Sequence, residues 1–186
     1  MAYNKYSLFV FRIESSRVTV RVGSTNQFAG GQIINVNLII IHPSYGNFLH
    51  NIALLKLEHS LEFSEKVDKI EIAEESDVFE DGTLVNVAGW GLQQNGIAPY
   101  KLQKAQMSLI NGPECEAQAG FGYDSVLCLK SPENTGVCNG DNGAGVVIGK
   151  KLIAVISFAF GGCGTKYPDV SSKISFYKLW IDNIIA

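Results

Sequence analysis

Short β-branched runs separated by turn residues constrain this sequence more than any other feature. Val18–Val22 alternates apolar and polar residues, Gln32–Ile41 is rich in Val and Ile, and the Gly-rich stretch Gly23–Gly31 lies between them as a turn. The same pattern predicts further strands at Tyr6–Ile13, Ile52–Leu57, Thr83–Trp90, Leu102–Ile110, Val146–Ile148 and Leu152–Phe158. Helical structure is expected only as one or two turns in Pro113–Ala119 and as a terminal amphipathic helix, Ser175–Ile185, which its first residue would cap. The sequence therefore predicts an all-β barrel or sandwich with a C-terminal helix.

The composition is that of a packed domain and argues against two classes of partner. Of the 186 residues, 46% are hydrophobic and 18% are charged, so a substantial core can form. The net charge is −3 and no Lys/Arg run is present, so we expect no nucleic-acid partner. The longest apolar stretch, Leu152–Phe160, is too short to cross a bilayer, so we expect no membrane partner.

The four cysteines indicate disulfides and an oxidising compartment, because an even number occurs in a Gly-rich β sequence. They are Cys115, Cys128, Cys138 and Cys163. Their spacing does not rank the three possible pairings. No CxxC pair occurs and the histidines lie far away in the sequence, so we expect no metal site and no cofactor.

The N-terminal residues do not form a convincing secretory signal. The apolar run Tyr6–Phe11 is short, Arg12 interrupts it, and no small-residue cleavage site follows. We therefore expect either that this segment is no signal or that Met1 is not the true start.

Several segments, in order along the chain, resemble the trypsin-like serine proteases of the S1 family. They are VRVGSTN at Val20–Asn26, GGQIINV at Gly30–Val36, HPSY at His42–Tyr45, NIALLKL at Asn51–Leu57, GTLVNVAGWG at Gly82–Gly91, and CNGDNGA at Cys138–Ala144. The last segment resembles the nucleophile loop, and Ile156–Phe158 resembles the strand beside the substrate backbone. The resemblance covers roughly Arg17 to the C-terminus.

The resemblance implies a double β-barrel with the active site in the cleft between the barrels. Residues 1–75 would form a partial first barrel, residues 76–174 the second barrel and residues 175–186 the C-terminal helix. It also implies the disulfides Cys115–Cys128 and Cys138–Cys163.

The catalytic positions implied by the resemblance are degenerate. The nucleophile position holds Asn142 and the acid position holds Asn51. A carboxamide has no ionisable nucleophile and cannot stabilise an imidazolium as a carboxylate does. The triad histidine should precede Val18, but residues 1–16 contain no His. We therefore expect no protease chemistry.

Other histidines and serines do not restore the triad. We interpret His42, His50 and His59 as ordinary surface or half-buried residues, with His50 pointing away from its neighbour Asn51 if the chain is extended there. Ser125, Ser131 and Ser157 occur outside any nucleophile motif.

The oxyanion loop survives in part. Gly140 and Gly143 occupy their family positions, whereas the following glycine is Ala144. In the family, Asp141 pairs with an N-terminal ammonium, and no Ile-Val-Gly-Gly start occurs here. We expect Asp141 either to turn to solvent or to stay buried and unpaired.

The specificity pocket maps to Gly136 at its base, Ala159 on one wall and Asp169 on the opposite wall. One hypothesis is that Asp169 supplies a negative charge to a basic side chain. The alternative is a pocket without a selected role, in which Asp169 is partly solvated.

We consider three functional hypotheses. The first is a secreted, non-catalytic homologue that binds a protein or peptide in the inter-barrel cleft as a decoy, cofactor or competitor. The second is a truncated or decayed gene product with no selected function. The third is a serine-type endopeptidase that acts through other residues.

The first barrel is expected to be the weaker half. Family members have further strands before Val18, and only Tyr3–Phe11 can replace them here. We therefore expect unpaired strand edges, lower stability and earlier opening in residues 1 to about 75.

Overall fold

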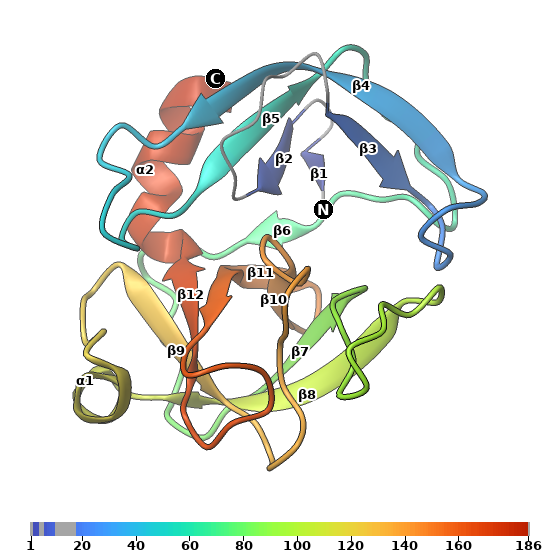
Figure 1. The fold of residues 1–186 in the computed structure, drawn as a ribbon. Coiled ribbons are helices and arrows are strands. Elements are labelled where there is room, and N and C mark those ends of the chain that lie inside the picture. Colours follow the sequence, from blue (N-terminus) through green and yellow to red (C-terminus); the bar gives the residue numbers. More distant parts are fainter. Residues whose placement is uncertain (1, 4–5, 10–17, 186) are drawn as a thin grey trace.

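The computed structural model describes residues 2–3, 6–9 and 18–185, which form two β-sheets and two helices (Figure 1). The first sheet has five strands in the order β1-β2-β5-β4-β3, all antiparallel to their neighbours. They are β1 (Ala2–Tyr3), β2 (Tyr6–Phe9), β3 (Thr19–Val22), β4 (Gln32–Ile41) and β5 (Ala53–Leu57). Within the described ranges no pairing joins β1 to β3, so this sheet is open and the first barrel is incomplete.

The second sheet closes into a barrel. Its seven strands follow the order β10-β7-β8-β9-β12-β11-β6, and an additional pairing of β10 with β11 closes the ring. They are β6 (Glu71–Ile72), β7 (Leu84–Gly89), β8 (Gln103–Ile110), β9 (Val126–Lys130), β10 (Gly145–Ile148), β11 (Lys151–Ala159) and β12 (Asp169–Lys173). The prediction of an all-β, trypsin-like double barrel with an incomplete first half and a C-terminal helix is confirmed.

Strand β4 shows why periodicity located most strands. Ile34 and Val36 are 4% exposed and point into the core, whereas the alternating Asn35 and Asn37 are exposed. The predicted bounds of β4, Gln32–Ile41, are confirmed. Strand β12 gives no such signal, because its residues Ser171 and Ser172 are polar but buried.

Four strands were not predicted, namely β1, β6, β9 and β12. Strand β6 lies in the range assigned to the first barrel, but Ile72 pairs in parallel with Leu152 of β11. The chain therefore joins the second sheet a few residues before the expected boundary.

The two helices begin and end differently. Helix α1 (Gly112–Ala119) is capped by Asn111, whose side chain accepts a hydrogen bond from the backbone N–H of Glu114 at 2.8 Å. Helix α2 (Ile174–Ile185) directly follows β12. Ser175 lies inside its first turn and is buried, so its prediction as the N-cap is wrong.

The two sheets bury cores of unequal size. The large core fills the second barrel and extends under α2 to Tyr177 and Ile181. The small core of the first sheet consists of Ile34, Val36, Leu55, Leu57, Leu61 and Val67. Strand β5 serves both, because Leu54 and the preceding Ile52 point into the large core while Leu55 and Leu57 point into the small one. This sharing fixes the position of Asn51, which lies between the sheets.

Candidate functional site

Asn51 links the two sheets at the position where the resemblance implies the triad acid. Its Nδ2 donates a hydrogen bond to Ser157 Oγ of β11 at 2.8 Å. Its backbone carbonyl accepts one from Ser172 Oγ of β12 at 2.9 Å. Ser157 and Ser172 are only 2% and 4% exposed, so these contacts lie in the packed region between the sheets.

Asn142, at the nucleophile position, contacts the same serine. Its Nδ2 donates to the backbone carbonyl of Ser157. The loop is held along β11, because Gly143 N donates to the Ile156 carbonyl at 2.9 Å and Ile156 N donates to the Ala144 carbonyl at 2.8 Å. Both carboxamides therefore converge on Ser157, and neither provides a nucleophile or a proton acceptor of useful basicity.

The histidines lie apart from this pair of asparagines. The rings of His42 and His50 stack on each other at 5.1 Å and face α2, and His59 is exposed. His50 has φ +50°, so the extended chain that was the condition of its predicted orientation is not present. Among the described residues, no hydrogen bond joins an imidazole to Asn51, Asn142 or Ser157.

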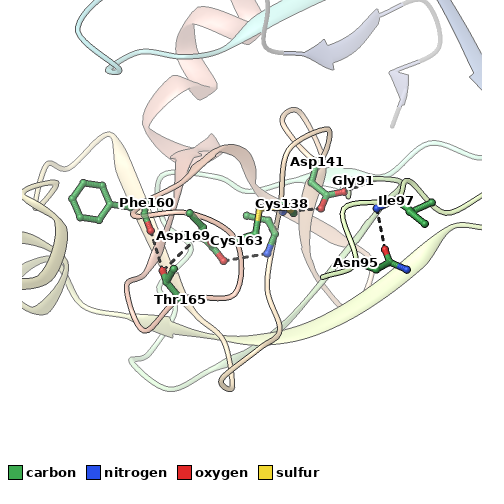
Figure 2. Close-up of a disulfide and its surroundings, with 11 residues drawn as sticks. Gly91, Asn95, Ile97, Cys138, Asp141, Phe160, Cys163, Thr165 and Asp169 are labelled. Atoms are coloured by element: carbon green, nitrogen blue, oxygen red, sulfur yellow. Dashed lines mark hydrogen bonds between the residues drawn. A yellow bond between two sulfur atoms is a disulfide. The ribbon is translucent and has the colours of Figure 1, made fainter. Parts of the chain in front are cut away.

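Asp141 is half-buried and accepts hydrogen bonds from the main chain, an arrangement between the two that the sequence predicted. Its two oxygens accept hydrogen bonds from the backbone N–H of Gly91 at 2.7 Å and of Cys138 at 3.0 Å (Figure 2). The close approach requires glycine, because a Cβ on Gly89 or Gly91 would lie 2.0 Å and 2.3 Å from the carboxylate oxygens. The half-buried carboxylate is thus held by main-chain donors from two loops. The neighbouring Gly140 has φ +99°, and a Cβ added at this position would lie 3.2 Å from Gly91 Cα.

The three residues assigned to the specificity pocket lie close together. Ala159 and Asp169 are directly paired partners on β11 and β12. A Cβ on Gly136 would lie 2.9 Å from Asp169 Oδ2, and the positive φ of +122° at this position also favours glycine. The backbone N–H of Val137 donates to the same Oδ2 at 3.2 Å.

Asp169 is a strongly perturbed acid. It is 5% exposed, so the partly solvated carboxylate of the alternative hypothesis is not what the structure contains. Burial raises the pKa of Asp169 from 3.8 to about 7, the Val137 hydrogen bond opposes this rise, and the nearby charge of Asp141 adds to it. Ser131 Oγ, also buried beside Gly136, has no hydrogen-bond partner among the described residues. The residues assigned to the pocket therefore include a buried carboxyl group that a bound cation would ionise.

A row of aromatic rings, which the sequence did not single out, begins next to Ser157. Phe158 packs at 5.5 Å from Phe48 and at 5.2 Å from Phe121, with the rings nearly perpendicular. Phe121 lies 6.2 Å from Phe160, which lies 5.6 Å from Tyr167. Phe48 is 69% exposed and has φ +65°, an unusual conformation for an aromatic residue. The local sequence around each ring is unremarkable because the rings meet only in the fold.

A groove of about 890 Å³ adjoins the loops that hold Asp141. Its lining residues include Gly136, Asp141, Lys104 and the Cys138–Cys163 disulfide. Asn142 and the aromatic row are not among them.

Both disulfides implied by the resemblance are present, Cys115–Cys128 and Cys138–Cys163. The second links the Asp141 loop to the loop that follows β11 (Figure 2). It thereby fixes the segment between Gly136 and Asn142 against the second barrel.

The family model described as Trypsin matches residues 10–181. The chain belongs to the trypsin family. It is 34% identical over 169 residues to "Trypsin iota" of Drosophila melanogaster, a match that covers 87% of this chain and 66% of that protein. It is 30% identical over 170 residues to "Serine protease SP24D" of Anopheles gambiae, which covers 91% of this chain and 61% of that protein.

Solved structures of this family share the fold. The serine protease neuropsin, expressed in mouse brain, superposes with a TM-score of 0.89 at 25% identity, over 98% of this chain and 86% of that one. The scabies mite inactivated protease paralogue S-D1 superposes with a TM-score of 0.88 at 23% identity, over 98% and 83%. The chain spans only about two thirds of the length of the curated trypsins that it matches. In the part of the chain that the structure describes, no helix is long and apolar enough to span a membrane.

Proposed function

We propose that this trypsin-family chain is a non-catalytic protein that binds an extended peptide segment in the cleft between its two sheets. The observation that carries the proposal is the convergence of Asn51 and Asn142 on Ser157. Acyl transfer in this family needs a hydroxyl, an imidazole and a carboxylate that are hydrogen bonded in series. Two of these positions hold carboxamides that are already hydrogen bonded within the protein, so the site favours binding over turnover.

The walls beside these asparagines provide the means of binding. Strand β10 pairs with β11 only as far as Val155, and no described strand pairs with that edge of β11 near Phe158 and Ala159. A peptide can add to such an edge through main-chain hydrogen bonds, and pockets then select its side chains. The aromatic row that starts at Phe48 and Phe158 offers apolar surface for one side chain of the peptide.

Asp169 gives this binding a chemical preference. A Lys or Arg side chain that reached the buried carboxyl would bind to its ionised form, which is only about half populated near pH 7. Binding should therefore release protons near neutral pH and grow tighter as pH rises. The two disulfides, which together pair all four cysteines, favour a secreted or other oxidising setting.

The test compares blocked peptides that carry a Phe two residues before either Arg or its neutral isostere citrulline. We expect the Arg peptide to bind at least about tenfold more tightly at pH 8. Calorimetry in two buffers of different ionisation enthalpy should show release of about half a proton at pH 7. Asp169→Asn should abolish the preference for Arg, whereas replacement of the exposed Asp124 by Asn, as a matched control, should retain it. Equal affinity for both peptides, or no binding of either, would contradict the proposal.

A further inference from the structure

The connection between β4 and β5 lies beside α2 (Figure 1). Two histidines of this connection contact the helix. The ring of His42 lies 5.0 Å from Trp180 and 5.2 Å from Tyr177, with both pairs edge to face. The ring of His50 stacks on His42 at 5.1 Å and lies 5.9 Å from Tyr177. We call His42, His50, Tyr177 and Trp180 the histidine clamp. It joins the first sheet to the terminal helix through aromatic contacts and through the contact of the Tyr177 hydroxyl with His50 Nδ1.

The hydrogen bond that His42 makes requires a neutral imidazole. Ser44 N lies 3.3 Å from His42 Nδ1 and can only donate, so this Nδ1 carries no proton. Tyr177 Oη lies 3.2 Å from His50 Nδ1. Burial raises the pKa of Tyr177, so its hydroxyl remains protonated and can donate to His50. A proton added to His42 Nδ1 would face the Ser44 N–H, and the hydrogen bond would be lost.

The charges around the clamp do not compensate a protonated ring. The titratable groups that contact the two imidazoles are the imidazoles themselves and the Tyr177 hydroxyl. On α2, Lys178 pairs with Glu74 at 3.3 Å and with Asp182 at 2.5 Å. No ion pair joins a carboxylate of the described residues to His42 or His50. Two imidazolium rings stacked at 5.1 Å would therefore repel each other with no opposite charge between them.

The connection that the clamp holds has a strained backbone. Asn47, Phe48 and His50 have φ angles of +47°, +65° and +50°, which non-glycine residues rarely adopt. Such a conformation persists only while surrounding contacts hold it, and the clamp supplies contacts on the α2 side. Loss of the clamp would let these residues relax to ordinary backbone angles.

We propose that the neutral His42–His50 pair fastens the β4–β5 connection to α2, and that protonation of His42 in acid releases it. Burial, followed by repulsion from His50, lowers the pKa of His42. The stabilisation from this contact is therefore complete above the ordinary imidazole pKa of 6.5 and is lost as pH falls through the lower value of the folded protein. The released segment carries Phe48 and leads into Asn51, so the cleft would lose one wall in acid. This consequence for peptide binding rests on the proposed function, whereas the release itself does not.

The test is hydrogen exchange of the amides from Ser44 to His50 at pH 5 and pH 7.5, corrected for intrinsic rates. We expect about tenfold faster exchange at pH 5 in the wild type. The double variant His42→Gln/His50→Gln keeps a side-chain acceptor but does not titrate, and its corrected rates should differ by less than about twofold between the two pH values. Replacement of the exposed His59 by Gln should leave the wild-type response unchanged.

Several outcomes would overturn this inference. An equally protected connection at pH 5 and pH 7.5 in the wild type contradicts it even if the double variant does not fold. A pH response that persists in the double variant contradicts it as well. The Asp169→Asn variant separates the two proposals, because Asp169 also titrates near neutral pH but lies in the second barrel. Release of the connection should persist in that variant while the preference for Arg peptides disappears.

Discussion

The two sheets of this molecule differ in whether their edge strands are paired. The second sheet closes through the pairing of β10 with β11, carries two disulfides and surrounds the large core. The first sheet remains open in the described part of the chain, and its own core is small. Closure satisfies main-chain donors and acceptors that an open sheet leaves to solvent. The cleft therefore lies between one rigid wall and one that depends on contacts with the other half.

Strand β5 belongs to both halves of the molecule. Ile52 and Leu54 are 1% and 2% exposed and belong to the large core, although the strand pairs within the first sheet. The Asn51 hydrogen bonds to Ser157 and Ser172 add polar links at the same place. The first sheet is thus anchored along β5 and is expected to be weakest along β3.

The largest expected effect is a difference in hydrogen exchange between the halves. Amides of β3 and of Gln32–Asn37 in β4 should exchange on the order of a thousandfold faster than those of β8 and β11. The shared strand β5 should exchange at an intermediate rate, because it cannot separate without opening the large core. Native-state exchange followed by mass spectrometry measures all of these segments at once. Uniform protection across both sheets in a monomer would show that the first half is as stable as a closed barrel.

The next effect concerns the buried acid of the second barrel. Because folding raises the pKa of Asp169 to about 7, the stability linked to its proton is complete below pH 3.8 and is lost as pH rises through 7. Asp169→Asn should therefore raise the free energy of unfolding by about 2–4 kcal/mol at pH 8 and by much less at pH 5. Urea unfolding at the two pH values measures this, with Asp124→Asn as the exposed control. A variant that stabilises equally at both pH values would contradict the buried, protonated acid.

The smallest effect tests the polar link between the halves. Asn51→Ala removes the donor to Ser157 Oγ and leaves a 2% exposed serine without that partner. We expect a loss of about 1–2 kcal/mol in the free energy of unfolding. Exchange should accelerate more in β5 than in β8, since the link joins the sheets rather than stabilising the second barrel. The exposed Asn37→Ala serves as a control, and an equal loss there would show that Asn51 has no bridging role.

Local sequence patterns predicted most of the strands. The bounds of β4 and the positions of β7, β8, β10 and β11 follow from apolar, β-branched runs and the turn residues between them. Strand β12 was missed because its buried Ser171 and Ser172 are stabilised by hydrogen bonds to Leu127 and Asn51, which are distant in sequence. A polar residue that is buried with a distant partner gives no local signal.

In the candidate site too, the sequence predicted some residues and missed the contacts that join distant segments. The resemblance to trypsins assigned Asn51, Asn142 and Asp169 to the cleft from short motifs. It gave no indication that Asp141 would be held by two backbone N–H groups, because that contact depends on the approach of Gly91 from another loop. The stacking of His42 on His50 likewise requires positive φ angles between them, which the residue types there do not predict.

The most direct test of a non-catalytic binding role is reaction with a serine-directed phosphonate, followed by intact-mass measurement. With carboxamides at positions 51 and 142 and no imidazole hydrogen bonded to Ser157 among the described residues, we predict no added mass after prolonged incubation. Asn142→Ser should also remain unlabelled, because the new hydroxyl would lack a general base, while an active trypsin treated in parallel is fully labelled. One phosphonyl group per chain in the wild-type protein would contradict the account.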